Sequence, residues 1–369
     1  MHRREFLVGT GTVAVATGVG TTPVIAQVPN VRFALNIVAK TIEMIDGSAV
    51  YMLAFGDRTG GAKVPGPVLR VREGDFVEIS VRNDTTEPHA FAIPGTTVNM
   101  GSIAPGATQL AAFVAPAGGT YLYLDPSRAP VNRLLGLHGV LVVAPAVGTT
   151  ARGNPTPYSR ALHTAASTAM FDALGGHYFP GDTWLPDNPA REKIWLFNQI
   201  DPRFNDMARL GIPIDPADMM ERFLPRYFTI NGLSGYDASE DPSIVPKGYI
   251  GEPTLIRTLN AGLVTHSPHI HGNDIHELAT TTANGGVLVA DNIIRRDTWS
   301  LPPLARKDVL LPFVKPDSIP DAAFPPREEP FPLRYVMHCH TEMSQTAGGG
   351  NYPQGAGTHW DLLGRRRTA

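Results

Sequence analysis

Short segments with alternating apolar and polar residues, separated by turns that contain Gly and Pro, recur along most of the chain. The clearest is residues 67–81, where the alternation runs on both sides of a Glu-Gly-Asp turn. A period of two buries one face of a β-strand, so this segment predicts a β-hairpin with one buried face. Residues 119–123 and 137–143 are predicted as further strands.

The same pattern returns in the second half, after a stretch that is rich in Pro, Ala and Asp. Strands are predicted at residues 193–197, 227–232, 254–262, 285–290 and 335–337. A chain of 369 residues is long enough for two domains of on the order of 100–200 residues each. We therefore predict an all-β protein with two β-sandwich domains, residues 27–146 and 193–369, joined by a connection at residues 147–192.

The N-terminus predicts a targeting segment. Arg3 and Arg4 precede an apolar stretch of small residues, and small residues surround a plausible cleavage point at Ala26. This arrangement predicts that residues 1–26 are a twin-arginine signal peptide and that the protein is periplasmic or secreted. An uncleaved membrane anchor is the alternative, but the apolar stretch is short and glycine-rich compared with the roughly 20 apolar residues of a membrane span.

The charge balance limits the possible partners, and the cysteine count limits the possible roles of the thiol. The chain has 31 basic and 34 acidic residues and no long run of one sign, which argues against a nucleic-acid partner. The single cysteine, Cys339, excludes a disulfide within the chain. It leaves three possibilities for this thiol, namely a buried inert group, a reactive group or a metal ligand.

Three histidines lie within six residues, at His266, His269 and His271. Residues two apart in a strand point to the same face, roughly 6.6 Å apart, so His269 and His271 can reach metals on one side. His266 is separated from them by a proline and can point elsewhere. Imidazole binds copper, zinc and iron alike, so the motif predicts a metal site without naming the metal.

A second cluster reads His338-Cys339-His340. In a strand, His338 and His340 share one face and Cys339 lies on the other. The thiolate and the two imidazoles can therefore serve two separate metal sites that are joined by a few covalent bonds. This arrangement suits electron transfer from a copper–thiolate centre, which needs two histidines and a cysteine, often with a distant methionine. We predict Cys339, His338 and His340 as catalytic residues.

The two motifs, His-x-x-His-x-His and His-Cys-His, resemble those of the last domain of the multicopper oxidases. Segments around residues 65–75 and 119–143 resemble the opening and the close of the family's first domain. The resemblance implies two Greek-key cupredoxin sandwiches. It also implies a type 1 copper at His266 and Cys339, and a trinuclear copper cluster faced by the remaining motif histidines, His269, His271, His338 and His340.

The first domain departs from the family pattern of two His-x-His pairs. Only His89 remains where the first pair is expected, and Leu124-Asp125-Pro126 stands where the second is expected. A complete trinuclear cluster of the usual kind is therefore not expected. We interpret His138 as a packed or interface residue rather than a replacement ligand.

The type 1 site also departs, because Ser344 stands where the family has a second histidine. His359 follows a Gly-rich loop and either returns to the copper or simply opens the last strand. Met343 is either an axial ligand or a core residue, and core packing is the commoner role of methionine.

These observations favour an exported copper oxidoreductase. By resemblance, a reducing substrate would donate electrons near His266 and Cys339, and they would pass through His338 or His340 to copper held between the domains, with dioxygen as acceptor. The family's two-domain members form trimers, so a neighbouring subunit of a homotrimer could supply missing ligands, with His89 and His138 as candidates. Two alternatives remain: a copper-binding or scaffold protein without oxidase activity, and a copper nitrite reductase-like enzyme, which places its type 1 cysteine in the first domain.

Overall fold

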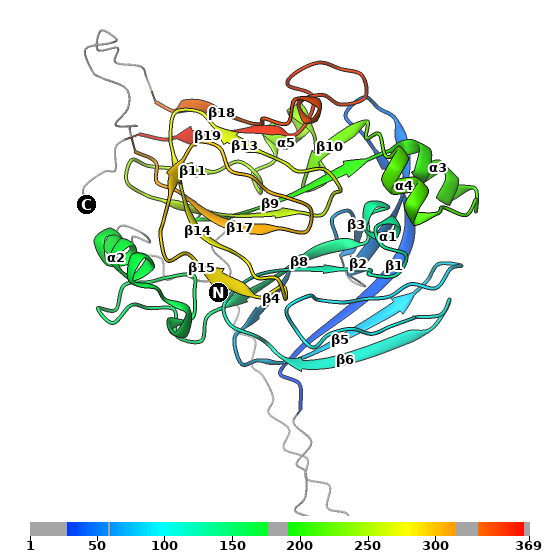
Figure 1. The fold of residues 1–369 in the computed structure, drawn as a ribbon, viewed down its shortest axis with the longest axis horizontal. Coiled ribbons are helices and arrows are strands. Elements are labelled where there is room, and N and C mark those ends of the chain that lie inside the picture. The colour runs from blue at the N-terminus through cyan, green and yellow to red at the C-terminus, as the bar shows by residue number, and fades with distance from the viewer. Residues whose placement is uncertain (1–27, 58–59, 176–190, 315–330, 365–369) are drawn as a thin grey trace, which may run out of the picture.

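The computed structural model describes residues 28–57, 60–175, 191–314 and 331–364, and β-strands are their main regular secondary structure. The strands form four sheets stacked one above another (Figure 1). Two sheets use strands from residues 31–144 and two use strands from residues 192–362, and none of the described strand pairs joins the two sets. The predicted signal peptide, residues 1–26, lies outside the described residues.

The first half is a sandwich of a five-stranded and a three-stranded sheet. The larger sheet has the order β3-β2-β1-β5-β6, with β1 antiparallel to β2 and parallel to β5. In the smaller sheet β8 lies between β4 and β7. The strands are β1 (Val31–Glu43), β2 (Ala49–Asp57), β3 (Gly61–Lys63), β4 (Leu69–Arg72), β5 (Phe76–Asn83), β6 (Thr108–Val114), β7 (Gly119–Leu124) and β8 (His138–Ala144).

The alternating segment of residues 67–81 forms two strands, but the prediction that they pair as a hairpin is wrong. β4 pairs with β8, whereas β5 pairs with β1 and β6. The turn between them therefore carries the chain from one sheet to the other, and Gly74 adopts a φ of 85° in it. Alternation indicates which face of a strand is buried, and it does not identify the neighbouring strand.

The second half is a larger sandwich. Its inner sheet has the order β10-β9-β12-β17-β14-β15, with β16 paired to β14, and its outer sheet has the order β11-β19-β18-β13. The strands are β9 (Glu192–Ile200), β10 (Tyr227–Ile230), β11 (Lys247–Gly248), β12 (Thr254–Asn260), β13 (Pro268–Ile270), β14 (Ile275–Thr281), β15 (Val287–Val289), β16 (Arg295–Arg296), β17 (Arg306–Leu311), β18 (Leu333–Cys339) and β19 (Gly357–Leu362).

The two halves share one topology. β9 pairs with β10 and β12 as β1 pairs with β2 and β5, and β12 then pairs with β17 as β5 pairs with β6. In the smaller sheets, β19 lies between β11 and β18 as β8 lies between β4 and β7. The repeat that the sequence pattern predicted is therefore present as a repeated fold.

Short helices connect the strands. They are α1 (Val131–Leu134), α2 (Ala165–Leu174), α3 (Pro202–Arg209), α4 (Pro216–Arg222) and α5 (Gly235–Glu240), with 3-10 turns η1 (Arg160–Leu162) and η4 (Glu342–Gln345). Asp201 and Asp215 cap α3 and α4, and a proline follows each cap. No helix among the described residues is long and apolar enough to cross a membrane.

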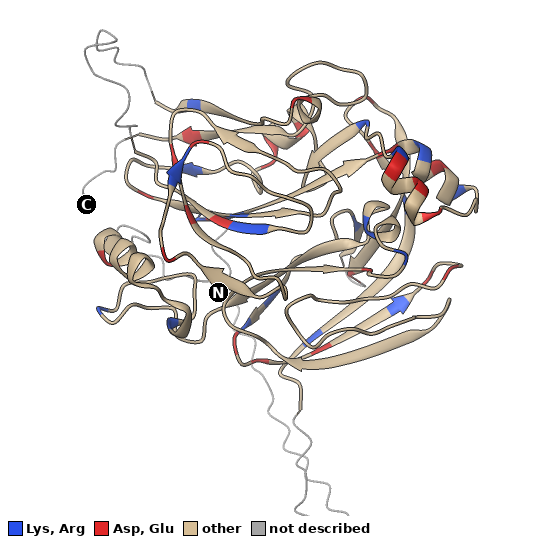
Figure 2. Ribbon diagram, viewed as in Figure 1, with Lys and Arg blue, Asp and Glu red and all other residues tan. Residues whose placement is uncertain are grey.

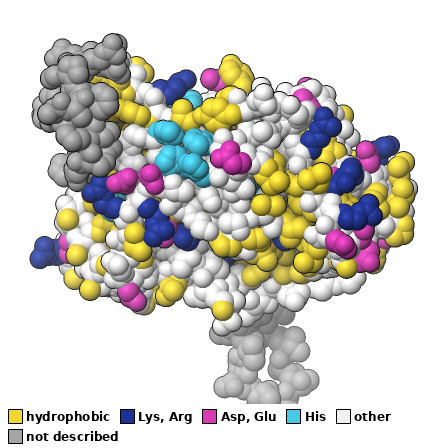
Figure 3. Space-filling model, turned by 45° about the horizontal axis from the view of Figure 1, so that its top comes forward, with side chains coloured by type: hydrophobic (Ala, Val, Ile, Leu, Met, Phe, Trp, Pro, Cys, Tyr) yellow, Lys and Arg dark blue, Asp and Glu magenta, His cyan; other side chains and the backbone are white. Residues whose placement is uncertain are grey.

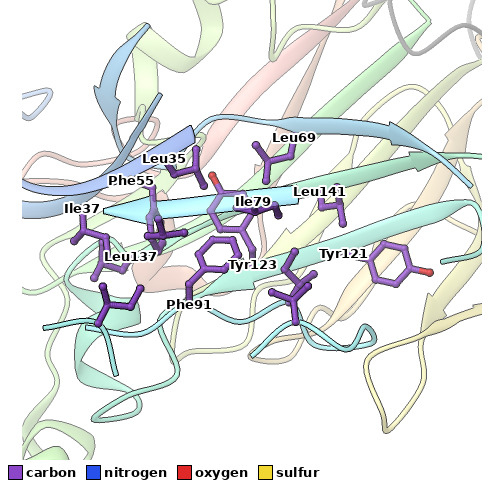
Figure 4. Packing of buried hydrophobic residues seen from close by; sticks show 14 of the residues in the cluster. Leu35, Ile37, Phe55, Leu69, Ile79, Phe91, Tyr121, Tyr123, Leu137 and Leu141 are labelled. Atoms are coloured by element: carbon purple, nitrogen blue, oxygen red, sulfur yellow. The ribbon is translucent and has the colours of Figure 1, made fainter. Parts of the chain in front are cut away.

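Each sandwich has its own core, and a third apolar layer joins them. The first core packs side chains such as Phe55, Phe91 and Tyr123 between its two sheets (Figure 4). The second core lies between the inner and outer sheets and includes Trp195 and Trp299. Leucine and valine side chains of β7 and β8 pack against β9 and β12, so the two inner faces form a continuous apolar contact.

A buried ionic network crosses the same interface. The Arg257 guanidinium is fully buried and contacts Glu192 and Asp308, both at 3.2 Å. From the first half, Arg70 contacts Glu192 at 2.8 Å, and Thr120 donates a hydrogen bond to Asp308. Charges of both signs are otherwise interspersed along the chain and are densest over α3 and α4 (Figure 2). The network fixes how the two sandwiches face each other.

Candidate metal centre

His266 and Cys339 meet inside the second sandwich. Cys339 ends β18 with its sulfur pointing into the core, and His266 lies six residues beyond the end of β12. The Nδ1 atom of His266 is 3.4 Å from the sulfur, and both side chains are 0% exposed. The backbone N–H of Ser267 donates to the sulfur at 3.2 Å. The Phe197 ring lies 4.9 Å from the His266 ring.

This pair fits a metal ion. An ion about 2.0 Å from a histidine nitrogen and about 2.3 Å from a thiolate would separate the two atoms by about 3.5 Å at a tetrahedral angle. Burial lowers the pKa of His266 to about 3, so the imidazole stays neutral and keeps a lone pair for a metal. A backbone N–H directed at the sulfur is the kind of contact that tunes a bound thiolate. The nitrogen–sulfur donor set suits copper.

The remaining type 1 candidates do not join this pair. Val336 of β18 pairs with His359 of β19, so His359 lies on the face opposite Cys339. His359 instead lies 3.4 Å from Asp361 on that face. Met343 is 44% exposed in η4, which is incompatible with a ligand buried beside Cys339. The structure therefore does not bring His359 or Met343 to this pair, and their role as copper ligands stays a prediction.

Four histidines gather on the opposite face of the same strands. The ligand atoms of His269, His271 and His338 all lie within 4.8 Å of one another. The Nε2 atoms of His271 and His338 are 3.1 Å apart, a separation that two imidazoles on one ion can adopt. The His340 ring lies 4.8 Å from that of His269. We call these four residues the histidine patch.

The histidine patch is accessible and suited to a metal. His271 and His340 are exposed, whereas His269 and His338 are partly buried. Burial lowers the pKa of His269 and of His338, and the neighbouring imidazoles lower the pKa of His338 further. The Nδ1 atom of His269 is hydrogen-bonded to the Thr298 hydroxyl at 2.8 Å. Neutral imidazoles, one of them oriented by a second residue, are what a metal site requires.

The position of the patch differs from the prediction. Histidine side chains form one surface patch (Figure 3), over the outer sheet that carries β13 and β18. Among the described residues, the rings and hydrogen-bonding groups that these four side chains contact all belong to the second half. The patch therefore does not lie between the two sandwiches of one chain, as the sequence interpretation required.

The first sandwich has a site at the position equivalent to His266 and Cys339. Asn83 ends β5 and Asn260 ends β12, and the histidine follows each asparagine by six residues. Asn83 donates to the carbonyl of Ile103 and Asn260 to that of Leu301, residues that bridge to His89 and His266 respectively. His89 is therefore the counterpart of His266.

Asp125 is the counterpart of Cys339. Its N–H donates to Leu137, the residue before β8, as that of Cys339 donates to Ala356, the residue before β19. Its carboxylate contacts the Nδ1 atom of His89 at 2.8 Å. It also accepts hydrogen bonds from Asn132 and from the N–H and hydroxyl of Ser127. Both Asp125 and His89 are buried, so this position is closed by hydrogen bonds.

The equivalent of the histidine patch in the first half is apolar. Ala92 bridges to Leu124 as His269 pairs with His338. The structure does not bring His89 to either group of candidate ligands, because its Nδ1 is bound to Asp125 inside the first sandwich. His138 is packed in β8 and is 0% exposed, as expected for a core residue. His89 and His138 are both buried within the chain, and their role as ligands at a subunit contact stays a prediction.

Sequence reasoning did not find Gln199, which contacts the metal-site histidine. Its side-chain nitrogen is hydrogen-bonded to the Nε2 atom of His266. Gln199 lies in β9 among apolar residues and belongs to no motif, so nothing in the sequence distinguishes it from other buried polar residues. Thr298, beside His269, is a second such case.

Comparisons with known proteins relate the chain to copper-containing proteins. Residues 58–147 match the multicopper oxidase family. The chain is 23% identical over 283 residues to the copper-containing nitrite reductase of Rhizobium meliloti, which covers 74% of this chain and 65% of that protein. It is 28% identical over 283 residues to the copper-containing nitrite reductase of Alcaligenes xylosoxydans xylosoxydans, which covers 73% of this chain and 74% of that protein. The chain thus spans just under two thirds of the length of the first of these relatives.

Solved structures extend the comparison to the fold. The blue copper oxidase of Nitrosomonas europaea matches with a TM-score of 0.62 and 22% identity, over 90% of this chain and 85% of that one. This match confirms the predicted all-β fold with cupredoxin-like sandwiches. Residues 58–147 thus match the multicopper oxidase family model, and the chain has the cupredoxin-like fold that multicopper oxidases and copper nitrite reductases share.

Proposed function

We propose that this protein is a copper oxidoreductase of the multicopper oxidase type with both of its metal sites in the second sandwich. His266 and Cys339 would hold one copper, and the histidine patch would hold another. Bound copper would supply one-electron redox chemistry at each position. The reducing substrate would be a small molecule, and dioxygen would be the electron acceptor.

One observation carries this proposal. Cys339 directs its sulfur inward to His266, whereas its two chain neighbours, His338 and His340, direct their rings outward to His269. The two donor sets are therefore joined through the backbone of three consecutive residues. A thiolate between two imidazoles that face a separate donor set is an arrangement that suits electron transfer between two metals.

The residues around the two sites have separate tasks. Phe197 and the sandwich core exclude water from the Cys339 sulfur, which favours a metal–thiolate bond. The histidine patch is exposed, so a small oxidant can reach it directly. Thr298 fixes the orientation of His269 at that surface.

Nitrite is a second candidate acceptor, because two of the similar proteins are named copper-containing nitrite reductases. Against it, the only cysteine here lies in the second half, and Asp125 stands at the equivalent position in the first. Reduced protein mixed anaerobically with nitrite, or aerobically without it, separates the two acceptors. Reoxidation only by dioxygen supports the oxidase reaction.

The exposed patch also favours assembly with other copies of this chain. Four imidazoles on an outer sheet give an incomplete ligand set for a cluster of several coppers, and a neighbouring chain could cover and complete it. We propose a homotrimer with copper at the contact between subunits, and export by the twin-arginine route. Sedimentation with and without copper tests the assembly, and the location of protein carrying Arg3→Lys and Arg4→Lys tests the route.

The proposal is tested by the copper content and the optical and EPR spectra of the wild type and of Cys339→Ser. We expect a thiolate-to-copper absorption band in the wild type that disappears in the variant, with copper at the histidine patch retained. Copper binding without that band in the wild type would instead support a copper-binding or scaffold protein. His276→Ala, a histidine of β14 outside both sites, is the matched control.

A further inference from the structure

A run of buried polar contacts connects the hydrogen-bonded pair of His89 and Asp125 in the first sandwich to the candidate metal site of His266 and Cys339 in the second. It starts at the Asp125 carboxylate, which accepts from His89 and, at 2.9 Å, from Asn132. Asn132 belongs to α1, so these hydrogen bonds fix the position of that helix. The next residue of α1 is Arg133, which is 6% exposed.

Arg133 reaches across into the second sandwich. Its Nη1 atom donates to the carbonyl of Ala261 and, at 2.6 Å, to that of Gly262. The carbonyl of Arg133 is in turn hydrogen-bonded to Nδ1 of His138 at 2.9 Å. A charged guanidinium that donates to two consecutive carbonyls restrains that loop more strongly than a neutral donor would. The loop in question, residues 261–265, leads directly to His266.

Gln199 holds the other side of the same loop. Its side-chain oxygen accepts from the N–H groups of Leu263 and Val264, at 2.6 and 2.9 Å. Its side-chain nitrogen is hydrogen-bonded to His266 and donates to the carbonyl of Val264 at 3.3 Å. A Cβ atom at Gly262 would overlap the Gln199 side chain, so only glycine admits this amide so close to the backbone.

We propose that Arg133 and Gln199 are positioning residues for the metal site at His266 and Cys339. Through Arg133, the first sandwich helps to set the geometry of a metal site that it does not itself contain, and Gln199 does so from within the second sandwich. The closed pair of His89 and Asp125 is thus the anchor of α1, from which Arg133 restrains the loop that carries His266. This inference rests on the proposed function, because it takes Cys339 and His266 as the metal ligands.

A purely structural role makes a different prediction. If Arg133 only contributed to folding, replacing it would lower the free energy of unfolding and leave the metal site unchanged in the folded fraction. If it positions His266, its loss changes the coordination of copper in fully folded protein. Copper affinity and spectra measured well below the unfolding temperature separate these cases.

The matched control is Arg306, a second buried arginine that donates hydrogen bonds to the backbone of a loop. It is 4% exposed and donates to the carbonyls of Gly285 and Gly286, away from His266. Burial lowers the pKa of Arg133 and of Arg306 alike, to about 10 in each case. The two arginines thus resemble each other in burial and partners and differ in the loop that they hold.

The experiment compares Arg133→Met, Arg133→Lys and Arg306→Met after copper loading. For Arg133→Met we expect a shifted thiolate-to-copper band, a changed copper hyperfine splitting and a loss of copper affinity of about 10–100-fold. Arg133→Lys should recover part of the affinity, and Arg306→Met should keep the wild-type spectrum. A wild-type spectrum and affinity in folded Arg133→Met would overturn the proposal.

Gln199 gives an independent variant in case Arg133→Met does not fold. Gln199→Glu keeps an acceptor for the two N–H groups, whereas Gln199→Leu removes every contact of the amide. We expect Gln199→Leu to lose copper affinity about 10–100-fold and Gln199→Glu to retain more of it. Equal affinities for Gln199→Leu and the wild type would contradict a positioning role.

Failure of the proposed function is recognised separately, in the wild type. If wild-type protein shows no thiolate-to-copper band, the assignment of Cys339 fails, and the positioning role is then tested on metal-free protein. An aromatic disulfide that reacts with thiols should modify Cys339 on the order of tenfold faster in Arg133→Met than in Arg306→Met. The reason is that the loop of residues 261–265, which leads to His266, would open more often without Arg133. Equal rates would overturn the positioning role as well.

Discussion

The two sandwiches surround equivalent positions with different chemistry. In the second, a thiol and an imidazole face each other, and no other ionisable side chain in the described part of the chain is in hydrogen-bond contact with the sulfur. In the first, a carboxylate takes the place of the thiol and accepts four hydrogen bonds. The backbone framework is the same, down to the asparagine six residues before each histidine.

This difference shows how one fold separates stability from function. The first site has its polar groups mutually satisfied, so it contributes to the stability of the fold. The second leaves a sulfur and a nitrogen available to a ligand, and it is restrained by contacts from elsewhere, namely Gln199 and Arg133. A fold repeated within a chain can therefore keep a metal site in one copy and use the other as its support.

The largest effect on the free energy of unfolding is expected from a substitution that removes the hydrogen bonds of Asp125. In metal-free protein, Asp125→Ala leaves His89, Asn132 and Ser127 without their acceptor, and we expect it to lower the free energy of unfolding by about 3–5 kcal/mol. Cys339→Ala removes one weak acceptor and should cost about 1 kcal/mol. Urea denaturation of both variants measures the contrast. Equal losses would mean that the two sites do not differ in their structural role.

The next largest effect is expected for the pH dependence of the free energy of unfolding, through His138 of the first sandwich. Burial lowers the pKa of His138 to about 4, below the ordinary value of 6.5. As the pH falls from 6.5 toward 4, the unfolded chain takes up a proton that the folded chain rejects, so stability is lost in that window. The loss is at most about 3 kcal/mol. Denaturation at several pH values should show a shallower acid dependence in His138→Gln, and an unchanged slope would refute this role.

A smaller effect is expected at the histidine patch. His271→Ala removes one of the three imidazoles whose ligand atoms converge, and we expect copper affinity there to fall by on the order of tenfold or more. The thiolate-to-copper band should persist, because Cys339 faces the other side of the strand. Copper titration followed by EPR tests this, with His163→Ala as the control. Loss of both signals together would mean that the two sites are one.

The smallest effects are expected for the two side chains that were predicted as copper ligands and that the structure does not bring to Cys339. His359→Gln and Met343→Leu should leave the absorption band within experimental error, because His359 lies on the opposite face and Met343 is largely exposed. A shifted band in either variant would place that side chain at the metal after all. Thermal denaturation of the same samples verifies that both remain folded.

The sequence was sufficient where short-range geometry decides. The period of two in a strand placed Cys339 on one face and His338 with His340 on the other, and the spacing of His269 and His271 brought them onto a common face. The repeated strand pattern was enough to predict two sandwiches of one topology. Each of these inferences depends on residues only a few positions apart.

Prediction from the sequence failed where the residues that contact each other are far apart in the chain. The pairing of β4 with β8 and of β5 with β1 is set by sheet packing, which alternation does not encode. The Gly-rich loop gave no measure of where His359 would return, and the register of β19 decided it. Asp125 looked like a missing histidine, and only the fold reveals that it is the counterpart of Cys339.

The most direct test of the contrast between the two halves is a crystal structure of copper-loaded protein, with anomalous scattering measured at the copper edge. We predict a peak between His266 and Cys339, a further peak at the histidine patch, and none between His89 and Asp125. A peak between His89 and Asp125, or no peak beside Cys339, would contradict the assignment of metal binding to the second sandwich.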